Sequence, residues 1–148
     1  VLIGKARILN CSDIEAFKSL SLKDLIKRLG NDQYVERLLI RFDGCKRLGK
    51  MSYYTDQPWL EEETAEWLVD NNCKLLGLDV AMPDNPKNSF DSEIDSPIHK
   101  ILLKKNVVIL EYLTNLSAIS KEYFQIVVAP LKIANSDGAP ARCFALED

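Results

Sequence analysis

Three short runs between Leu75 and Leu116 decide the fold: LLGLD at 75–79, PIHKILL at 97–103 and VVILEYLTNL at 107–116. The first and third are apolar, as expected of strands buried on both faces, and the second suits a short helix. A strand, a helix and a further strand in this order are typical of an α/β domain. The helix holds the chain's only histidine, His99, and the third run has an acid, Glu111, where its strand ends.

The same alternation continues on either side of these runs. We expect strands at Ala6–Cys11, Arg37–Phe42, Lys74–Val80, Val107–Leu110, Phe124–Ala129 and near Arg142–Ala145. We expect helices from Leu22 to Leu29, from about Glu61 to Asn71 and from Ile98 to Lys105. Ser21 and Gly30 are typical of the two ends of the first helix, and three consecutive acids favour the start of the second. The strand at Arg37–Phe42 is expected to be central, and Trp67 to anchor a helix in the core rather than stack on a ligand.

Length and composition set limits on the class of protein. With 148 residues and 47% hydrophobic composition, we expect one domain covering residues 1–148. The net charge of -3 and the dispersed basic residues argue against a nucleic-acid partner. Since no apolar run approaches the roughly 20 residues of a membrane-spanning helix, no membrane partner is expected either.

The four cysteines are far apart in the sequence. They stand at Cys11, Cys45, Cys73 and Cys143, without any C-x-x-C pair. This spacing excludes a zinc ribbon and a thioredoxin-type motif, so we expect free, reduced thiols and a cytoplasmic location.

Several motifs, in their order and spacing, resemble the C-terminal part of one enzyme family. They are Gly77-Leu78-Asp79, Pro97-Ile98-His99 with Leu102-Leu103, Glu111 with Asn115-Leu116, Ala129-Pro130-Leu131-Lys132 and Asp137-Gly138-Ala139-Pro140-Ala141-Arg142. The family is that of the cyclase-like metal-dependent hydrolases, which includes the bacterial type of kynurenine formamidase and isatin hydrolase.

The resemblance implies a fold, a cofactor and an activity. The fold would be an α/β domain of the swivelling β/β/α kind, with mixed sheets and flanking helices, in a homodimer or higher homo-oligomer. The cofactor would be a divalent metal, zinc or manganese, and the reaction hydrolysis of an amide-like bond in a small-molecule substrate. His99 and Glu111, twelve positions apart, match the family's metal ligands, whereas no catalytic or substrate-binding residue is assigned. The loops at Met51–Trp59 and Met82–Phe90 are expected to shape the substrate pocket.

The sequence departs from the family at its first metal motif. An H-x-G-T-H-x-D-x-P-x-H run, which supplies three ligands and the acid/base histidine, is expected before Ala6 and is absent. Two explanations stay open. The chain is the C-terminal portion of an enzyme and inactive alone, which a start without Met favours, or it is a non-catalytic member that serves as a scaffold or regulatory subunit.

Residue spacing gives a geometric expectation for the metal pair. A helix from Ile98 to Lys105 and a strand from Val107 to Glu111 run back past one another, so the strand's end should lie near His99. The alternative is that His99 begins a surface helix and that Glu111 is a solvated strand end. An imidazole and a carboxylate suit zinc or manganese, but two ligands are too few for tight binding. We therefore expect the pair to face a gap that the absent run would fill.

Asp79 and Arg142 also have two interpretations each. Asp79 follows a strand of the expected sheet, where α/β proteins place function, but such an acid is also a common turn or cap residue. For Arg142 we expect an ion pair with an acid that fixes the last strand, rather than substrate contact.

Overall fold

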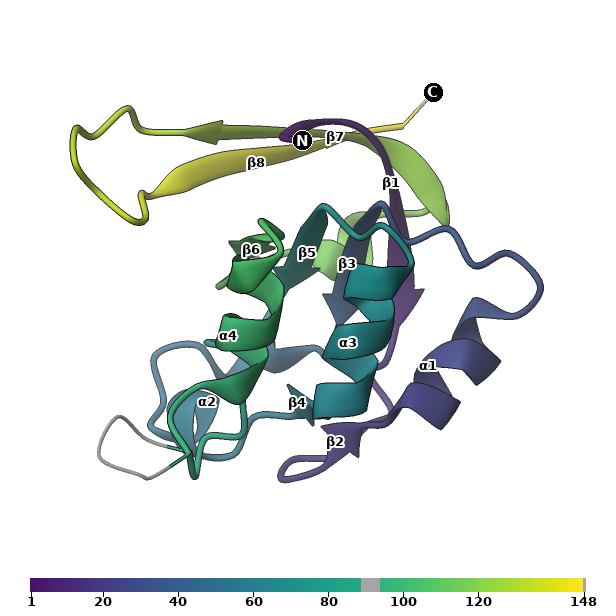
Figure 1. Cartoon of the computed structure of the whole chain (residues 1–148), viewed down its shortest axis with the longest axis vertical. Helices are drawn as coiled ribbons and strands as arrows, with labels where there is room; N and C mark the ends of the chain where they lie inside the picture. Colours follow the sequence, from purple (N-terminus) through teal and green to yellow (C-terminus); the bar gives the residue numbers. More distant parts are fainter. Residues whose placement is uncertain (89–93, 148) are drawn as a thin grey trace.

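The computed structural model of the chain describes residues 1–88 and 94–147 (Figure 1). A 6-stranded sheet runs through it in the order β6-β5-β3-β1-β7-β8. Its strands are β1 (Ile3–Asn10), β3 (Arg37–Arg41), β5 (Leu75–Leu78), β6 (Val108–Leu110), β7 (Tyr123–Pro130) and β8 (Ala141–Leu146). The first four are parallel to one another, whereas β7 and β8 are antiparallel to their neighbours. Short strands β2 (Ser19–Leu20) and β4 (Trp59–Leu60) pair separately.

Three helices cover one face of the parallel strands. They are α1 (Leu22–Leu29), α3 (Glu62–Asp70) and α4 (Pro97–Lys104), which lie in front of the sheet in Figure 1. A short helix α2 (Ser52–Thr55) and two 3-10 turns, η1 (Gly44–Arg47) and η2 (Leu116–Ala118), complete the elements of the described residues. The α/β class with a mixed sheet and flanking helices is therefore confirmed.

The sheet is buried on both faces where its strands are parallel. Alternating residues of β3 show this, because Leu38 and Ile40 pack among the helices whereas Leu39 packs on the opposite face. That opposite face is covered by Leu113 and Leu116, which follow β6. A strand with apolar contacts on both sides requires a continuous apolar run, as the sequence has here. The expected central position of this strand is confirmed.

The segment from Cys45 to Pro58 lies mostly at the surface but contains buried side chains. The aromatic ring of Tyr53 is buried, and its centroid lies 5.2 Å from that of Tyr54 and 5.6 Å from that of Tyr112. Gln57 is also fully buried. Contacts with residues far along the chain bury these two side chains, although the segment has no hydrophobic period.

The cysteines, Trp67 and the helix lengths each bear on an expectation from the sequence. All four cysteines are free, as predicted. Trp67 is half-buried and packs against the cluster beneath the helices, in agreement with an anchoring role. In residues 1–88 and 94–147, no helix combines the length and apolar character needed to cross a membrane.

Gly77 allows the closest packing in the sheet, and its replacement gives a test of the fold. A Cβ atom there would overlap Leu39 Cδ2 and lie 2.9 Å from Leu113 Cδ1. We expect Gly77→Ala to lower the free energy of unfolding by about 1–3 kcal/mol, because both neighbours are buried and overpacking forces them to shift. Urea unfolding measures the effect. Gly138→Ala is the matched control, since nothing lies within 4 Å of its Cβ position. Equal losses in the two variants would contradict the packing described.

Candidate functional site

The carboxyl ends of the parallel strands bring several polar groups to one edge of the sheet. Phe42 follows β3, Asp79 follows β5 and Glu111 follows β6. The first turn of α4, which contains His99, lies at the same edge because α4 runs antiparallel to the strand that follows it. Crevices at this edge of an open α/β sheet are the usual place for ligands.

The first turn of α4 is held by a carboxylate from another segment. Ser96 at the N-cap adopts a left-handed conformation with φ 44° and makes no capping hydrogen bond. Instead, the buried Asp84 accepts a hydrogen bond from Ile98 N at 2.7 Å and another from His99 N at 3.3 Å. Asp84 therefore satisfies amides that a helix N-terminus leaves without partners.

The imidazole of His99 lies between two carboxylates. Its Nδ1 is 2.5 Å from Asp84 Oδ2, and its Nε2 is 3.2 Å from Glu111 Oε1. The structure thus brings together the two residues that sequence reasoning paired. The assignment of these residues as metal ligands stays a prediction.

The two carboxylates also set the charge of the ring. The carboxylate of Asp84, and after it the nearby carboxylate of Glu111, raises the pKa of His99 to about 9, although burial of the ring acts in the opposite sense. The ring is therefore protonated at neutral pH when no other cation neutralises the carboxylates. Geometry nevertheless distinguishes the two contacts. Among the described residues no donor is placed to hydrogen-bond Glu111 Oε1, which is buried, so the 3.2 Å approach of His99 Nε2 is an ion-pair contact.

The donor set partly fits a divalent cation. Glu111 Oε1 is a buried carboxylate oxygen without a hydrogen bond, and it faces an imidazole nitrogen, which together are suitable ligands for zinc or manganese. Within residues 1–88 and 94–147, no group of three or more His, Cys, Asp and Glu side chains could hold a metal ion. Asp84 does not extend the set, since it contacts the opposite ring nitrogen. His99 and Glu111 therefore fit as two ligands of a metal centre that needs further ligands.

The turn after Glu111 fixes the direction of its side chain. Tyr112 has φ 57°, a conformation that costs energy for a bulky residue. Its N–H donates to Val80 O at 3.1 Å, and Leu113 N donates to Leu78 O at 3.0 Å. These two hydrogen bonds hold the segment against the end of β5.

Asp79 links the ends of two neighbouring strands. Its side chain is fully buried, and Oδ1 accepts a hydrogen bond from Phe42 N at 2.7 Å, which joins the end of β5 to the end of β3. No donor among the described residues reaches Oδ2. Burial raises the pKa of this carboxyl, although the hydrogen bond from Phe42 opposes the shift. The turn or cap interpretation is the one that these contacts support.

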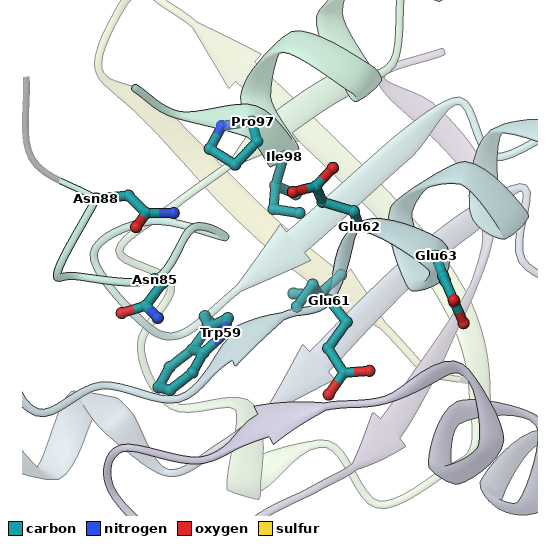
Figure 2. A pocket seen from close by; sticks show the side chains of 9 residues that line it. Trp59, Glu61, Glu62, Glu63, Asn85, Asn88, Pro97 and Ile98 are labelled. Atoms are coloured by element: carbon teal, nitrogen blue, oxygen red, sulfur yellow. The ribbon is translucent and has the colours of Figure 1, made fainter. Parts of the chain in front are cut away.

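Two hollows flank the His99–Glu111 pair without containing both residues. A groove of about 920 Å³ lies between β8 and the segment after β6, and Glu111 is part of its lining. A smaller hollow of about 340 Å³ lies beside the start of α4. Figure 2 shows Glu62 directed toward Pro97 and Ile98 in this hollow, whereas Glu61 and Glu63 point away from them. The geometry of the pair, rather than either hollow, identifies the candidate site.

The two loops expected to shape the substrate pocket are Met51–Trp59 and Met82–Phe90. Trp59 lines the smaller hollow. Of the loop Met82–Phe90, residues 89 and 90 lie outside the described part of the chain. No role in substrate binding is assigned to either loop.

The expected ion pair of Arg142 is not found. No salt bridge involves Arg142 in residues 1–88 and 94–147, and its guanidinium carbon lies 5.7 Å from the centroid of the Phe144 ring. The prediction is wrong because β8 is an edge strand whose outer residues face solvent rather than a buried acid.

Sequence reasoning missed two buried polar residues of the site, Asp84 and Gln57. Gln57 Nε2 donates to Met82 O at 2.9 Å and to Asp84 O at 3.2 Å, and its Oε1 accepts from Ala81 N at 2.9 Å. Asp84 lies in a polar loop with Pro and Asn, where the pattern predicts only turns. Neither residue belongs to a periodic element, so no local signal distinguishes it.

Comparison with known proteins identifies the family. Residues 1–85 match the family model described as putative cyclase. The chain belongs to the putative cyclase family. Proteins with similar sequences include the kynurenine formamidases of Bacillus cereus (strain ATCC 10987 / NRS 248), 29% identical, and of Bacillus thuringiensis (strain Al Hakam), 32% identical, each over 143 residues. Each alignment covers 96% of this chain and 62% of the relative, so the chain spans about three fifths of their length.

Solved structures share the fold of this cyclase-family chain. An isatin hydrolase bound to the product analogue thioisatinate superimposes with a TM-score of 0.84 at 21% identity, over 97% of this chain and 60% of the other. A potential metal-dependent hydrolase with cyclase activity gives a TM-score of 0.77 at 22% identity, over 97% and 65%. At these identities the likeness establishes the fold alone.

The raised pKa of Asp79 predicts a pH dependence of stability. The folded chain binds this proton more tightly than the unfolded chain, whose aspartate pKa is about 3.9. Stability therefore falls as pH rises from about 4 through the raised pKa, since the folded state holds more protons in that window. Asp79→Asn keeps an acceptor for Phe42 N but cannot ionise.

The test is urea unfolding of both proteins between about pH 4 and pH 8. We expect the free energy of unfolding of Asp79→Asn, minus that of the unsubstituted chain, to increase with pH and then level off. A difference between the two proteins that is the same at every pH does not affect this trend. A relative stability that decreases with pH would show that the ionised carboxylate is the form favoured by the fold.

Proposed function

We propose that this chain acts as part of a divalent-metal-dependent hydrolase that cleaves an amide-like bond of a small molecule. The observation that carries the proposal is the contact of His99 Nε2 with Glu111 Oε1, an oxygen buried without a hydrogen bond. A buried carboxylate oxygen costs free energy unless a donor or a cation neutralises it. The protonated His99 ring neutralises this oxygen in the chain alone, and a divalent cation held by both groups would take the place of the proton on Nε2.

The relatives support the reaction class. Kynurenine formamidase and isatin hydrolase are named for a formamide and a cyclic amide, and both compounds contain an amide-type carbonyl. Another fold neighbour is described as a potential metal-dependent hydrolase. The bond that these compounds have in common is of the amide type, and the substrate of this chain stays open.

The side chains have distinct roles in this proposal. His99 Nε2 and Glu111 would hold the ion, and an ion bound there would polarise the scissile carbonyl and activate water. Glu111 is held in place by the turn at Tyr112, whose backbone is fixed to the end of β5. Metal centres of this type draw at least three ligands from protein, so the remaining ligands would come from outside residues 1–88 and 94–147. This chain alone is expected to bind metal weakly.

A non-catalytic scaffold or regulatory subunit is the second candidate. The observation that favours it is the lack of a third metal ligand within residues 1–88 and 94–147. Zinc or manganese as the ion and a homodimer or higher homo-oligomer are further proposals that rest on the family resemblance. A cytoplasmic location is a proposal that rests on the four free cysteines.

Metal analysis and a hydrolysis assay of the full-length gene product test the proposal. With N-formylkynurenine and isatin as substrates, we expect Glu111→Gln to lose bound metal and to lower kcat/KM by at least about 100-fold. The reason is that a metal ion supplies several kcal/mol of transition-state stabilisation. Glu66→Gln is the matched control, because it makes the same chemical change on an exposed position of α3.

The outcomes separate the two candidate functions. Loss of metal and activity in Glu111→Gln but not in Glu66→Gln supports the hydrolase. A full-length protein that holds no metal and hydrolyses neither compound contradicts it and favours the scaffold.

A further inference from the structure

Asp84 is the one carboxylate of the described chain that contacts both the backbone and the imidazole of the candidate centre. Its side chain is completely buried, in the loop between β5 and α4. One oxygen, Oδ1, accepts from Ile98 N at 2.7 Å, and the other, Oδ2, lies 2.5 Å from His99 Nδ1. A buried carboxylate with this many partners is well satisfied and strongly oriented.

The two oxygens of Asp84 have different partners. Oδ1 accepts from the backbone at Ile98 N, whereas Oδ2 contacts the ring at His99 Nδ1 and also accepts a longer hydrogen bond from His99 N. An imidazole hydrogen-bonded at Nδ1 can rotate only if that bond breaks, so Nε2 keeps its direction toward Glu111. A carboxylate on the far nitrogen of a metal-binding histidine fixes both the tautomer and the ring orientation.

Gln57 in turn fixes the loop that carries Asp84. Its fully buried amide donates to Met82 O and Asp84 O and accepts from Ala81 N, which are backbone groups of one loop. Because Gln57 follows α2 and not the loop itself, the position of Asp84 depends on a contact across 27 residues of sequence. The support for the ring therefore extends from α2 to α4.

We infer that Asp84 is the positioning residue of the centre: it anchors His99 at Nδ1 so that Nε2 is directed at Glu111 and is available to a divalent cation. This inference rests on the proposed function, since the direction of Nε2 matters for catalysis only if a cation binds there. Asp84 does not touch the cation or the substrate in this arrangement. Its effect passes through His99.

A purely structural role for Asp84 is the competing explanation, and Asp84→Asn separates the two. The amide oxygen of asparagine can still accept from Ile98 N and cap α4. Its NH₂ group would take the place of Oδ2 and could no longer accept from His99 Nδ1–H or from His99 N. Asp84→Asn thus keeps the shorter cap hydrogen bond, from Ile98 N, and removes the acceptor that holds a proton on Nδ1.

The first measurement needs no metal. Because His99 is the only histidine, ¹⁵N-histidine labelling of this chain gives the NMR signals of one imidazole. At one fixed pH near neutrality, we expect a resolved Nδ1–H proton, protected from exchange with water, in the unsubstituted chain. In Asp84→Asn this proton should exchange too fast to be detected, while the backbone amide spectrum stays folded.

The second measurement is the affinity for Zn²⁺ of the full-length gene product. We expect Asp84→Asn to raise the Kd for Zn²⁺ by about 10-fold to 100-fold, the usual effect of removing the carboxylate behind a ligating histidine. Ile98→Val is the matched control: it shortens a buried side chain in the same turn of α4 and leaves Asp84 and His99 unchanged. The Kd of Ile98→Val for Zn²⁺ should not change, even if its melting temperature falls as much as that of Asp84→Asn.

The results distinguish failure of the inference from failure of the proposed function. A protected Nδ1–H in Asp84→Asn, or equal losses of Zn²⁺ affinity in Asp84→Asn and Ile98→Val, would overturn the inference and leave Asp84 as a helix cap. If the unsubstituted full-length protein binds no Zn²⁺, the proposed function fails instead. The NMR comparison then still decides whether Asp84 orients the ring.

Discussion

The buried carboxylate of Asp84 is the contact on which the arrangement of the candidate centre depends. It joins a loop after β5 to the first turn of α4 and to the imidazole of His99. Ser96, the residue at the N-cap, does not perform this task itself. A helix whose end is held by a distant segment has its position set by that segment as well as by its own packing. The direction of the His99 ring follows from this contact, and its charge follows from this contact together with the one to Glu111.

The sheet supplies the rigid support for that contact. The parallel strands β3, β5 and β6 end at a common edge, and the continuous apolar runs within them bury both faces. The close approach at Gly77 lets Leu39 and Leu113 pack against the strand, which brings the segment after β6 onto the sheet. Glu111 is thereby held where the strand ends. A rigid sheet edge thus places one member of the pair, and the helix held by Asp84 places the other.

Sequence predicted the parts of the structure that depend on neighbours along the chain. The strands and helices were predictable from apolar runs and capping residues, and the approach of His99 to Glu111 followed from a helix and a strand joined by a short turn. Asp84 and Gln57 were not predictable, because their partners lie 14 to 27 residues away and nothing local marks those contacts. Arg142 was misjudged for a related reason: whether an arginine meets an acid depends on which strand borders its own. The family resemblance named the correct family but says nothing of these supporting contacts.

The central claim is that His99 Nε2 and Glu111 are two ligands of one divalent cation, with Asp84 behind the ring. A crystal structure of the full-length gene product with Zn²⁺, in which anomalous scattering locates the ion, tests it most directly. The account predicts an ion about 2.0–2.2 Å from both His99 Nε2 and a carboxylate oxygen of Glu111, with Asp84 still on Nδ1. An ion bound elsewhere, with His99 and Glu111 still contacting only each other, would contradict it.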